Sequence, residues 1–256
     1  MKKEVTYKTP EGECIKATEV TKDLGVHFNS KGSFSDHIQL KSTKAKQMTG
    51  YICRTFITRD REVMLTLLRS LVLPIIDYSS VVWNPHLQQD INLLESPQRV
   101  LTSKIDGMEG LDYYHRLKLL NIYSSERRRD RYLILYIMKV LQGKVPNPGI
   151  SYKYSARRGK VLTTPSVTTS KASHAATLMH HSFTRRAPRI FNSLPKEIRN
   201  LPHDTPPDLM KKRVDTFLSK ITDEPRLPGY YPSNSAASNK LEDQIRTMEF
   251  LAEGHQ

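Results

Sequence analysis

The sequence predicts a mainly α-helical protein with an N-terminal β-hairpin and a basic, partly irregular C-terminal region. Three observations support this fold class. Apolar residues recur at steps of three and four over much of the first 148 residues, β-favouring residues flank turn signals before residue 30, and large apolar residues become sparse after residue 149. The chain has 256 residues with 38% apolar content, enough for one substantial core or two small ones.

Residues 1–30 are expected to form the hairpin. Tyr7 and Ile15 lie on either side of a turn signal at Pro10–Gly12, and a second β-rich run extends from Val20 to Phe28. Hairpins are typical of short β-rich runs that are interrupted by glycine and proline. The sequence therefore predicts a small antiparallel element ahead of the helices.

Residues 31–148 are expected to form a helical domain. Helical spacing of apolar side chains predicts five successive helices within the ranges 34–52, 60–73, 91–105, 113–120 and 125–141. Pro74 predicts a bend or break at the end of the second helix. Pro97 disfavours a continuous third helix, because a proline inside a helix removes an amide donor and crowds the preceding turn at a cost of about 3 kcal/mol.

Residues 149–222 are expected to be a basic region with short helices, and residues 223–256 a flexible tail with one helix candidate near its end. Ser, Thr, Lys and Arg predominate between Gly149 and Ser182, which favours an irregular connector over short edge strands. Two helix candidates follow at residues 182–194 and 208–221, with prolines between them.

The charge of the chain predicts a polyanionic partner. Lys and Arg total 40 against 26 Asp and Glu, for a net charge of +14 and a pI near 9.7. Such a balance favours the phosphate backbone common to RNA, DNA and an RNA–DNA hybrid. The candidate phosphate contacts are Arg185, Arg186 and Arg189, then Arg157 and Arg158, then Arg127, Arg128, Arg99 and Lys104. For the Arg127 cluster, a helix face that is merely solvated is the stronger alternative.

Several other classes of function find no support in the sequence. The longest apolar run, Leu71–Trp83, contains Pro74 and Asp77 and is too short to span a membrane. No apolar signal core follows Met1, so we expect an intracellular protein, nuclear or cytoplasmic. Cys14 and Cys53 are expected to be reduced packing residues. We assign no catalytic residue and no metal ligand, because the sequence has no Asp-Asp pair, no phosphate-binding glycine loop and only scattered histidines.

Four passages of this sequence form an ordered set: TKDLGVHF with SFSDHI at residues 21–38, PIIDYSSVVWNP with INLLESPQR at residues 74–99, residues 125–143, and SFTRRAPRIFNSLP at residues 182–195. In that order they resemble the region after the catalytic core of jockey-like non-LTR retrotransposon reverse transcriptases. The corresponding family patterns are a "YLGV, then F..HI" passage, a "P.L.Y.S.VW.P....I..LE..QR" thumb signature, "LE.RR…YK.L.G" and "SF..R…..WNSLP". This sequence departs from the family at Asp23, where an aromatic residue is usual, at Phe191, where tryptophan is usual, and at Pro97, which lies inside the usual helical "LE..QR" run.

The resemblance implies that residues 1–30 are the primer-grip edge of the polymerase palm, with Leu24 and Gly25 in its turn. The helices that follow would be the thumb, which clasps template and primer. The family's catalytic Tyr-Ala-Asp-Asp strand, which uses magnesium, has no counterpart in this chain. The chain is therefore expected to need no cofactor of its own and to hold nucleic acid without polymerising it. The alternatives are a stand-alone nucleic-acid-binding protein from a decayed or host-recruited element, and a helical structural or interaction domain.

Overall fold

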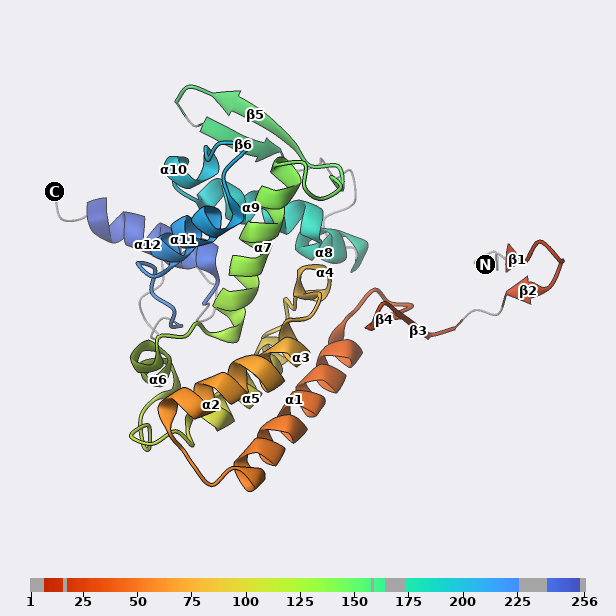
Figure 1. Ribbon diagram of the computed structural model, residues 1–256. Coiled ribbons are helices and arrows are strands. Elements are labelled where there is room, and N and C mark those ends of the chain that lie inside the picture. Colours follow the sequence, from red (N-terminus) through yellow and green to blue (C-terminus); the bar gives the residue numbers. More distant parts are fainter. Residues whose placement is uncertain (1–6, 16–17, 158, 164–173, 226–238, 254–256) are drawn as a thin grey trace.

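A computed structural model describes residues 7–15, 18–157, 159–163, 174–225 and 239–253 of the chain. It confirms the predicted fold class: the protein is mainly helical, and it begins with short β-hairpins (Figure 1). Within the described residues the strands form three separate two-stranded antiparallel sheets. The helices enclose two hydrophobic cores, one in each half of the chain.

The N-terminal region contains two hairpins where one was expected. Strands β1 (Tyr7–Lys8) and β2 (Cys14–Ile15) flank the predicted turn at Pro10–Gly12 and stand away from the body of the protein (Figure 1). Strands β3 (Val20–Asp23) and β4 (Val26–Asn29) form the second hairpin. The run of β-favouring residues from Val20 to Phe28 therefore contains two strands and a two-residue turn.

The first core is built on two long helices, α1 (Ser35–Thr55) and α5 (Gln88–Thr102). Between them, α2 (Arg61–Leu67), a π-helical turn η1 (Leu68–Val72) and α3 (Leu73–Asp77) follow one another without a break. The wider π turn lets the helix continue past Pro74 for one turn, so the predicted break does not occur at the proline itself. The short helices α4 (Ser80–Trp83) and α6 (Tyr113–Leu120) complete this half.

The second core surrounds α7 (Ser125–Leu141). It combines α9 (Phe183–Ser193), α11 (Pro207–Leu218) and α12 (Leu241–Glu253) with the hairpin β5 (Ser151–Ser155) and β6 (Gly159–Thr163), beside which lie the short helices α8 (His174–His181) and α10 (Lys196–Arg199). Apolar residues of α7 belong to this core, so the cores divide before Ser125, whereas the expected domain boundary was residue 148.

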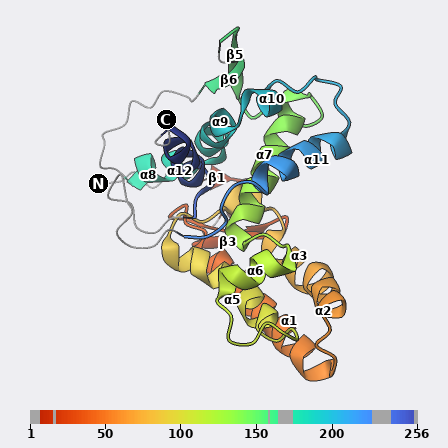
Figure 2. The same ribbon diagram turned by 90° about the vertical axis from the view of Figure 1, so that its left-hand side faces the viewer.

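The β5–β6 hairpin and helix α8 form much of residues 149–182, where the composition favoured an irregular connector, and residues 158 and 164–173 of that stretch lie outside the described residues (Figure 2). Strand β6 is fixed by two asparagines outside the sheet. The Asn192 side chain accepts from the Leu162 N–H at 2.8 Å and donates to its carbonyl at 2.9 Å, while Asn200 accepts from the Lys160 N–H at 2.9 Å. Because these side chains satisfy backbone groups of an edge strand, a sequence with few large apolar residues can still form a strand here.

Helix α5 runs without interruption through Pro97, contrary to the expectation from the sequence. Proline has no amide hydrogen, so the carbonyl of Leu93 loses its usual donor four residues along the helix. The buried hydroxyl of Ser42 on α1 donates to that carbonyl at 2.6 Å. A side chain from the neighbouring helix thus supplies a hydrogen bond where the proline cannot.

We predict that Ser42→Ala lowers the free energy of unfolding by about 1–3 kcal/mol, because it leaves the partly buried Leu93 carbonyl without this donor. In a Pro97→Ala background the same change should cost less, since the alanine amide can donate to Leu93. Urea unfolding of the four proteins in this double-mutant cycle measures the difference.

The matched control is Ser70→Ala, because the exposed Ser70 hydroxyl also donates to a helix carbonyl, that of Thr66, at 2.7 Å. It should change stability by less than Ser42→Ala. Equal costs of Ser42→Ala in the two backgrounds would contradict the assignment of Ser42 as the replacement donor.

Candidate nucleic-acid interface

The turn between β3 and β4 has an unusual backbone. Leu24 has φ of 43° and Gly25 has φ of 83°, which are values typical of a tight two-residue hairpin turn. Such a value is common for glycine and rare for leucine, and the Leu24 side chain is 83% exposed. The Tyr78 hydroxyl donates to the Leu24 carbonyl at 3.0 Å and so holds the turn from the side of α3. The two residues expected at the primer-grip turn therefore do occupy a turn.

Lys41 lies beside Tyr78, and Lys22 and Lys44 are close enough to Lys41 to affect its charge. The Lys41 ammonium lies 5.7 Å from the centroid of the Tyr78 ring, which is 51% exposed. Burial, followed by the nearby positive charges of Lys44 and Lys22, lowers the pKa of Lys41. The two neighbouring cations come from α1 and β3, so the lysines converge from separate elements. We call Lys22, Leu24, Lys41, Lys44 and Tyr78 the hairpin–helix surface.

A buried histidine anchors the hairpin to α1 beneath this surface. His37 has no exposed area, and its Nδ1 accepts from the His27 backbone N–H of β4 at 3.2 Å. Burial, with smaller contributions from the charges of Lys41 and His27, lowers the pKa of His37 to about 4. A neutral imidazole at pH 7 can serve as this acceptor, so the position of the hairpin depends on an uncharged His37.

The hairpin–helix surface combines features that suit a nucleic-acid backbone. Lysine ammonium groups neutralise phosphates, and a half-exposed tyrosine ring offers a face on which a base can stack. The family resemblance implied a turn at Leu24 and Gly25, and the structure has one there. Sequence reasoning did not include Lys22, Lys41, Lys44 or Tyr78 among the contacts. The spacing of Lys41 and Lys44 along one helix was the available signal. Their proximity to Lys22 and Tyr78 depends on the tertiary fold.

Other predicted contacts lie elsewhere on the protein. Arg99 and Lys104 are exposed near the C-terminal end of α5, where the Arg99 guanidinium lies 4.2 Å from the Tyr113 ring centroid. Arg157 is exposed in the turn between β5 and β6, and Arg158 lies outside the described residues. Arg99 and Lys104 do not join the hairpin–helix surface, because β4 packs beside His37 at the opposite end of the α1–α5 pair.

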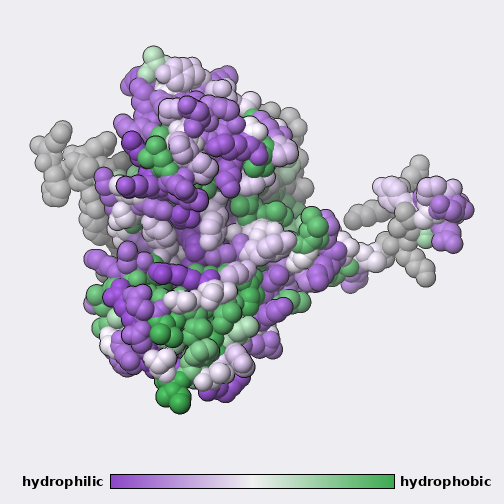
Figure 3. Space-filling view, viewed as in Figure 1, coloured by the Kyte–Doolittle hydropathy of each residue, from purple (hydrophilic) through white to green (hydrophobic). Residues whose placement is uncertain are grey.

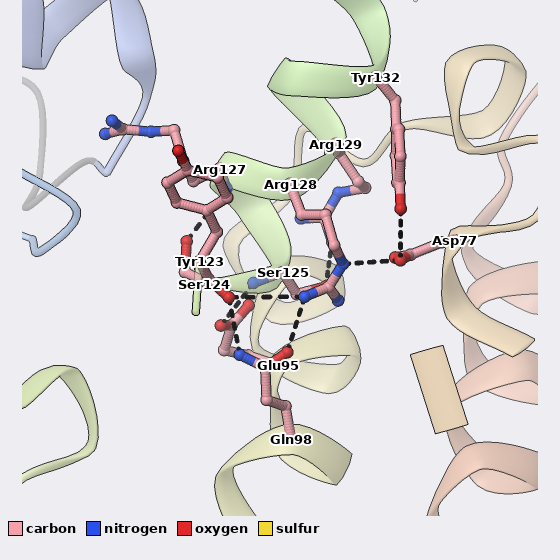
Figure 4. Close-up of polar contacts among 10 residues, drawn as sticks. All are labelled: Asp77, Glu95, Gln98, Tyr123, Ser124, Ser125, Arg127, Arg128, Arg129 and Tyr132. Atoms are coloured by element: carbon pink, nitrogen blue, oxygen red, sulfur yellow. Dashed lines mark hydrogen bonds and ion pairs between the residues drawn. The ribbon is translucent and has the colours of Figure 1, made fainter. Parts of the chain in front are cut away.

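Arg127 and Arg128 require a correction, because both are buried. Figure 4 shows them on different sides of α7, within a polar network. The Arg128 Nε lies 2.6 Å from Asp77 and its Nη1 donates to Gln98 at 2.9 Å, while Arg127 donates to the Thr222 carbonyl at 2.8 Å. Since protein groups bind these guanidinium groups inside the fold, neither residue can contact a phosphate at the surface.

The arginines of α9 are half-buried. Arg186 forms an ion pair with Asp130 of α7, and the Nε of Arg189 lies 3.6 Å from Glu242 of α12. The Nη1 of Arg189 also donates to the His180 carbonyl at 3.0 Å. The structure therefore places Arg185, Arg186 and Arg189 on one helix, with acidic partners already at two of them.

Two glutamates near the start of α7 have raised pKa values. Glu95 is buried and accepts from the Tyr113 hydroxyl at 2.5 Å and from the Ser125 N–H at 2.8 Å, and its burial raises its pKa. Burial and the neighbouring Asp130 carboxylate raise the pKa of Glu126 to about 7. Neither residue belongs to a metal-binding cluster, since no group of three potential ligands occurs in the described part of the chain.

Comparisons with known proteins assign no family. No family model matches the chain, and no solved structure matches it. Over 132 residues the chain is 24% identical to an uncharacterized protein of Caenorhabditis elegans, a match that covers 50% of this chain and 67% of the relative. Among the helices that the structure describes, none is long and apolar enough to cross a bilayer.

The raised pKa of Glu126 predicts a pH-dependent contribution to stability. Its pKa is about 7 in the folded protein against an ordinary value of 4.5, so the folded state holds the proton more tightly. This contribution is fully present below pH 4.5 and is lost as the pH rises toward 7. Urea unfolding at several pH values should show wild type losing stability relative to Glu126→Gln across that window.

Glu62→Gln is the matched control, because Glu62 is exposed on α2. Its stability should follow that of wild type through the same pH range. Parallel curves for wild type and Glu126→Gln would contradict the raised pKa.

Proposed function

We propose that this chain is a non-catalytic, template- and primer-holding portion of a non-LTR retrotransposon RNA-directed DNA polymerase. The proposal is supported by four motif resemblances in the family's order. The observation that carries it is the hairpin–helix surface, where the Leu24–Gly25 turn meets Tyr78 and Lys41. The family places a primer-gripping turn beside its thumb helices, and the turn residues and the first thumb helix of this chain adjoin one another.

In this proposal the lysines bind the backbone and Tyr78 supports a base. Lys22, Lys41 and Lys44 neutralise adjacent phosphates, which releases condensed counterions and makes the affinity dependent on salt. The hydroxyl of Tyr78 keeps its hydrogen bond to Leu24, so the ring stays in place at the turn. None of these contacts reads a base edge, and RNA, DNA or a hybrid can satisfy them.

The proposal assigns no chemistry to this chain. Two-metal phosphoryl transfer requires carboxylates that converge on one site, and the sequence has no Asp-Asp pair. In the family, magnesium binds in the catalytic part of the palm, to which none of the matched motifs belongs. The role of this chain would be to fix the position of the nucleic acid relative to that part.

We predict that Lys41→Gln/Lys44→Gln weakens binding of a labelled RNA–DNA hybrid and reduces the slope of log affinity against log salt. Each lost phosphate contact should lower the slope by about 0.7–0.9. Fluorescence anisotropy over a series of salt concentrations measures both quantities.

The matched control is Lys211→Gln/Lys212→Gln, which removes the same charge from exposed positions on α11. The control should retain most of the wild-type slope. If both double variants lose the same affinity, the attraction comes from net charge and the hairpin–helix surface has no special role.

We also predict that the purified chain does not extend a primer on an RNA template with magnesium and deoxynucleotides present. A gel assay with a complete reverse transcriptase as positive control tests this. Extension by this chain that exceeds a variant with Lys41 and Lys44 replaced would refute the non-catalytic assignment.

Two alternatives are distinguishable. A stand-alone nucleic-acid-binding protein would fold alone and bind with the same dependence on Lys41 and Lys44. A helical interaction domain is favoured by the apolar surface that Figure 3 shows over α2 and α3. Val63 of α2 and Leu71 of η1 are each more than one-third exposed. That reading predicts little nucleic-acid binding at physiological salt.

A further inference from the structure

Helix α12 brings acidic side chains to the arginine-rich helix α9. The α9 segment contains three arginines and no acidic residue, whereas α12 contains four acidic residues and one arginine. Two of the acidic residues, Glu242 and Asp243, lie in the first turn of α12. Figures 1 and 2 both show α12 beside α9, and the two helices pack against one another.

The contact is specific because apolar residues fix the start of α12. Leu241 is fully buried and Ile245 is 3% exposed, and both belong to the second core. Between these two residues on the chain, Glu242 lies 3.6 Å from the Nε of Arg189. The Nη1 of that guanidinium donates to the His180 carbonyl at 3.0 Å and also lies 3.2 and 3.4 Å from the two ring nitrogens of His180. A carboxylate and a carbonyl oxygen therefore already serve Arg189.

A carboxylate paired with an arginine uses the donors that a phosphate would use, since both accept from N–H groups along an edge of the planar guanidinium. The side chains of Arg189 and Glu242 are 30% and 21% exposed, so the pair lies at the surface within reach of a ligand. By contrast, the neighbouring Arg186 pairs with Asp130, whose side chain is only 3% exposed. Among the acidic partners of the α9 arginines, Glu242 of α12 is thus the one that a ligand can replace.

We propose that the first turn of α12 and nucleic acid compete for Arg189, with Glu242 occupying the position that a backbone phosphate would take. This inference rests on the proposed nucleic-acid-binding function and adds a second surface to it. The hairpin–helix surface binds first, and α9 contributes only when Glu242 gives up its arginine. The apparent affinity for nucleic acid is then lower than the number of basic residues implies, because Glu242 neutralises part of their charge within the chain.

The test compares full-length wild type with Glu242→Gln, which keeps the shape of the side chain and removes its charge. We expect Glu242→Gln to bind a labelled RNA–DNA hybrid about fivefold more tightly. The salt slope should rise by about 0.7–0.9, as for one added phosphate contact. In the double variant Glu242→Gln/Arg189→Gln, the tighter binding and the larger salt slope should both disappear. Arg189, which Glu242→Gln makes available to a phosphate, is absent from that variant.

The matched control is Asp204→Asn, which removes one negative charge from an exposed position before α11. Equal gains from Glu242→Gln and Asp204→Asn would overturn the proposal, since net charge alone would then explain them. A Glu242→Gln protein that binds as wild type does would overturn it as well.

Hydrogen exchange of the wild-type chain gives an independent readout if the variant folds poorly. Addition of the hybrid should reduce protection of the amides at the start of α12, and unchanged protection there would contradict the competition. If wild type and every variant fail to bind at low salt, the proposed function itself fails. If wild type binds through Lys41 and Lys44 and α12 does not respond, only the competition is wrong.

Discussion

The ion pair between Arg128 and Asp77 joins the two halves of this protein. Asp77 ends α3 in the first core, and Arg128 lies on α7, whose apolar residues belong to the second. Arg128 also donates to Gln98 of α5, and Tyr132 donates to Asp77 at 3.3 Å (Figure 4). Removing one partner of a buried pair leaves an uncompensated charge and costs about 3–5 kcal/mol, so this contact constrains how the two cores dock. Within the second core, Arg131 of α7 forms a further ion pair with Asp215 of α11.

The same ion pair determines where the hairpin–helix surface forms. Tyr78 directly follows Asp77, and its backbone carbonyl accepts from the buried Trp83 indole at 2.8 Å. With its main chain held on both sides, Tyr78 presents a hydroxyl that reaches the Leu24 carbonyl 54 residues earlier in the chain. An exposed turn with positive φ at a leucine is therefore supported from the interior. Local strain of this kind persists where surrounding contacts over-determine the backbone.

Sequence reasoning recovered what depends on local pattern and missed what depends on partners distant in the chain. Helical spacing predicted α1, α5 and α7, whereas the turn at Leu24–Gly25 was implied by the family resemblance and not by the local pattern. The continuity of α5 was not predictable, because the hydroxyl that serves the Leu93 carbonyl comes from Ser42 on another helix. The β5–β6 hairpin was missed for the same reason. Two backbone N–H groups of its strand β6 donate to asparagine side chains that lie 30 and 40 residues further along the chain.

The largest error, the role given to Arg127 and Arg128, follows from how arginine and lysine differ. Arginine was favoured as a phosphate contact because its planar guanidinium donates several hydrogen bonds in fixed directions. The same property suits a protein interior, where carboxylate, amide and carbonyl oxygens must be satisfied together, as Asp77 and Gln98 are by Arg128. Lysine carries a compact, strongly hydrated charge that stays near water, and Lys44 and Lys46 of α1 are exposed in this way. A basic residue count therefore overstates the charge available to a ligand, and at the α7 arginines the guanidinium groups hold the fold together.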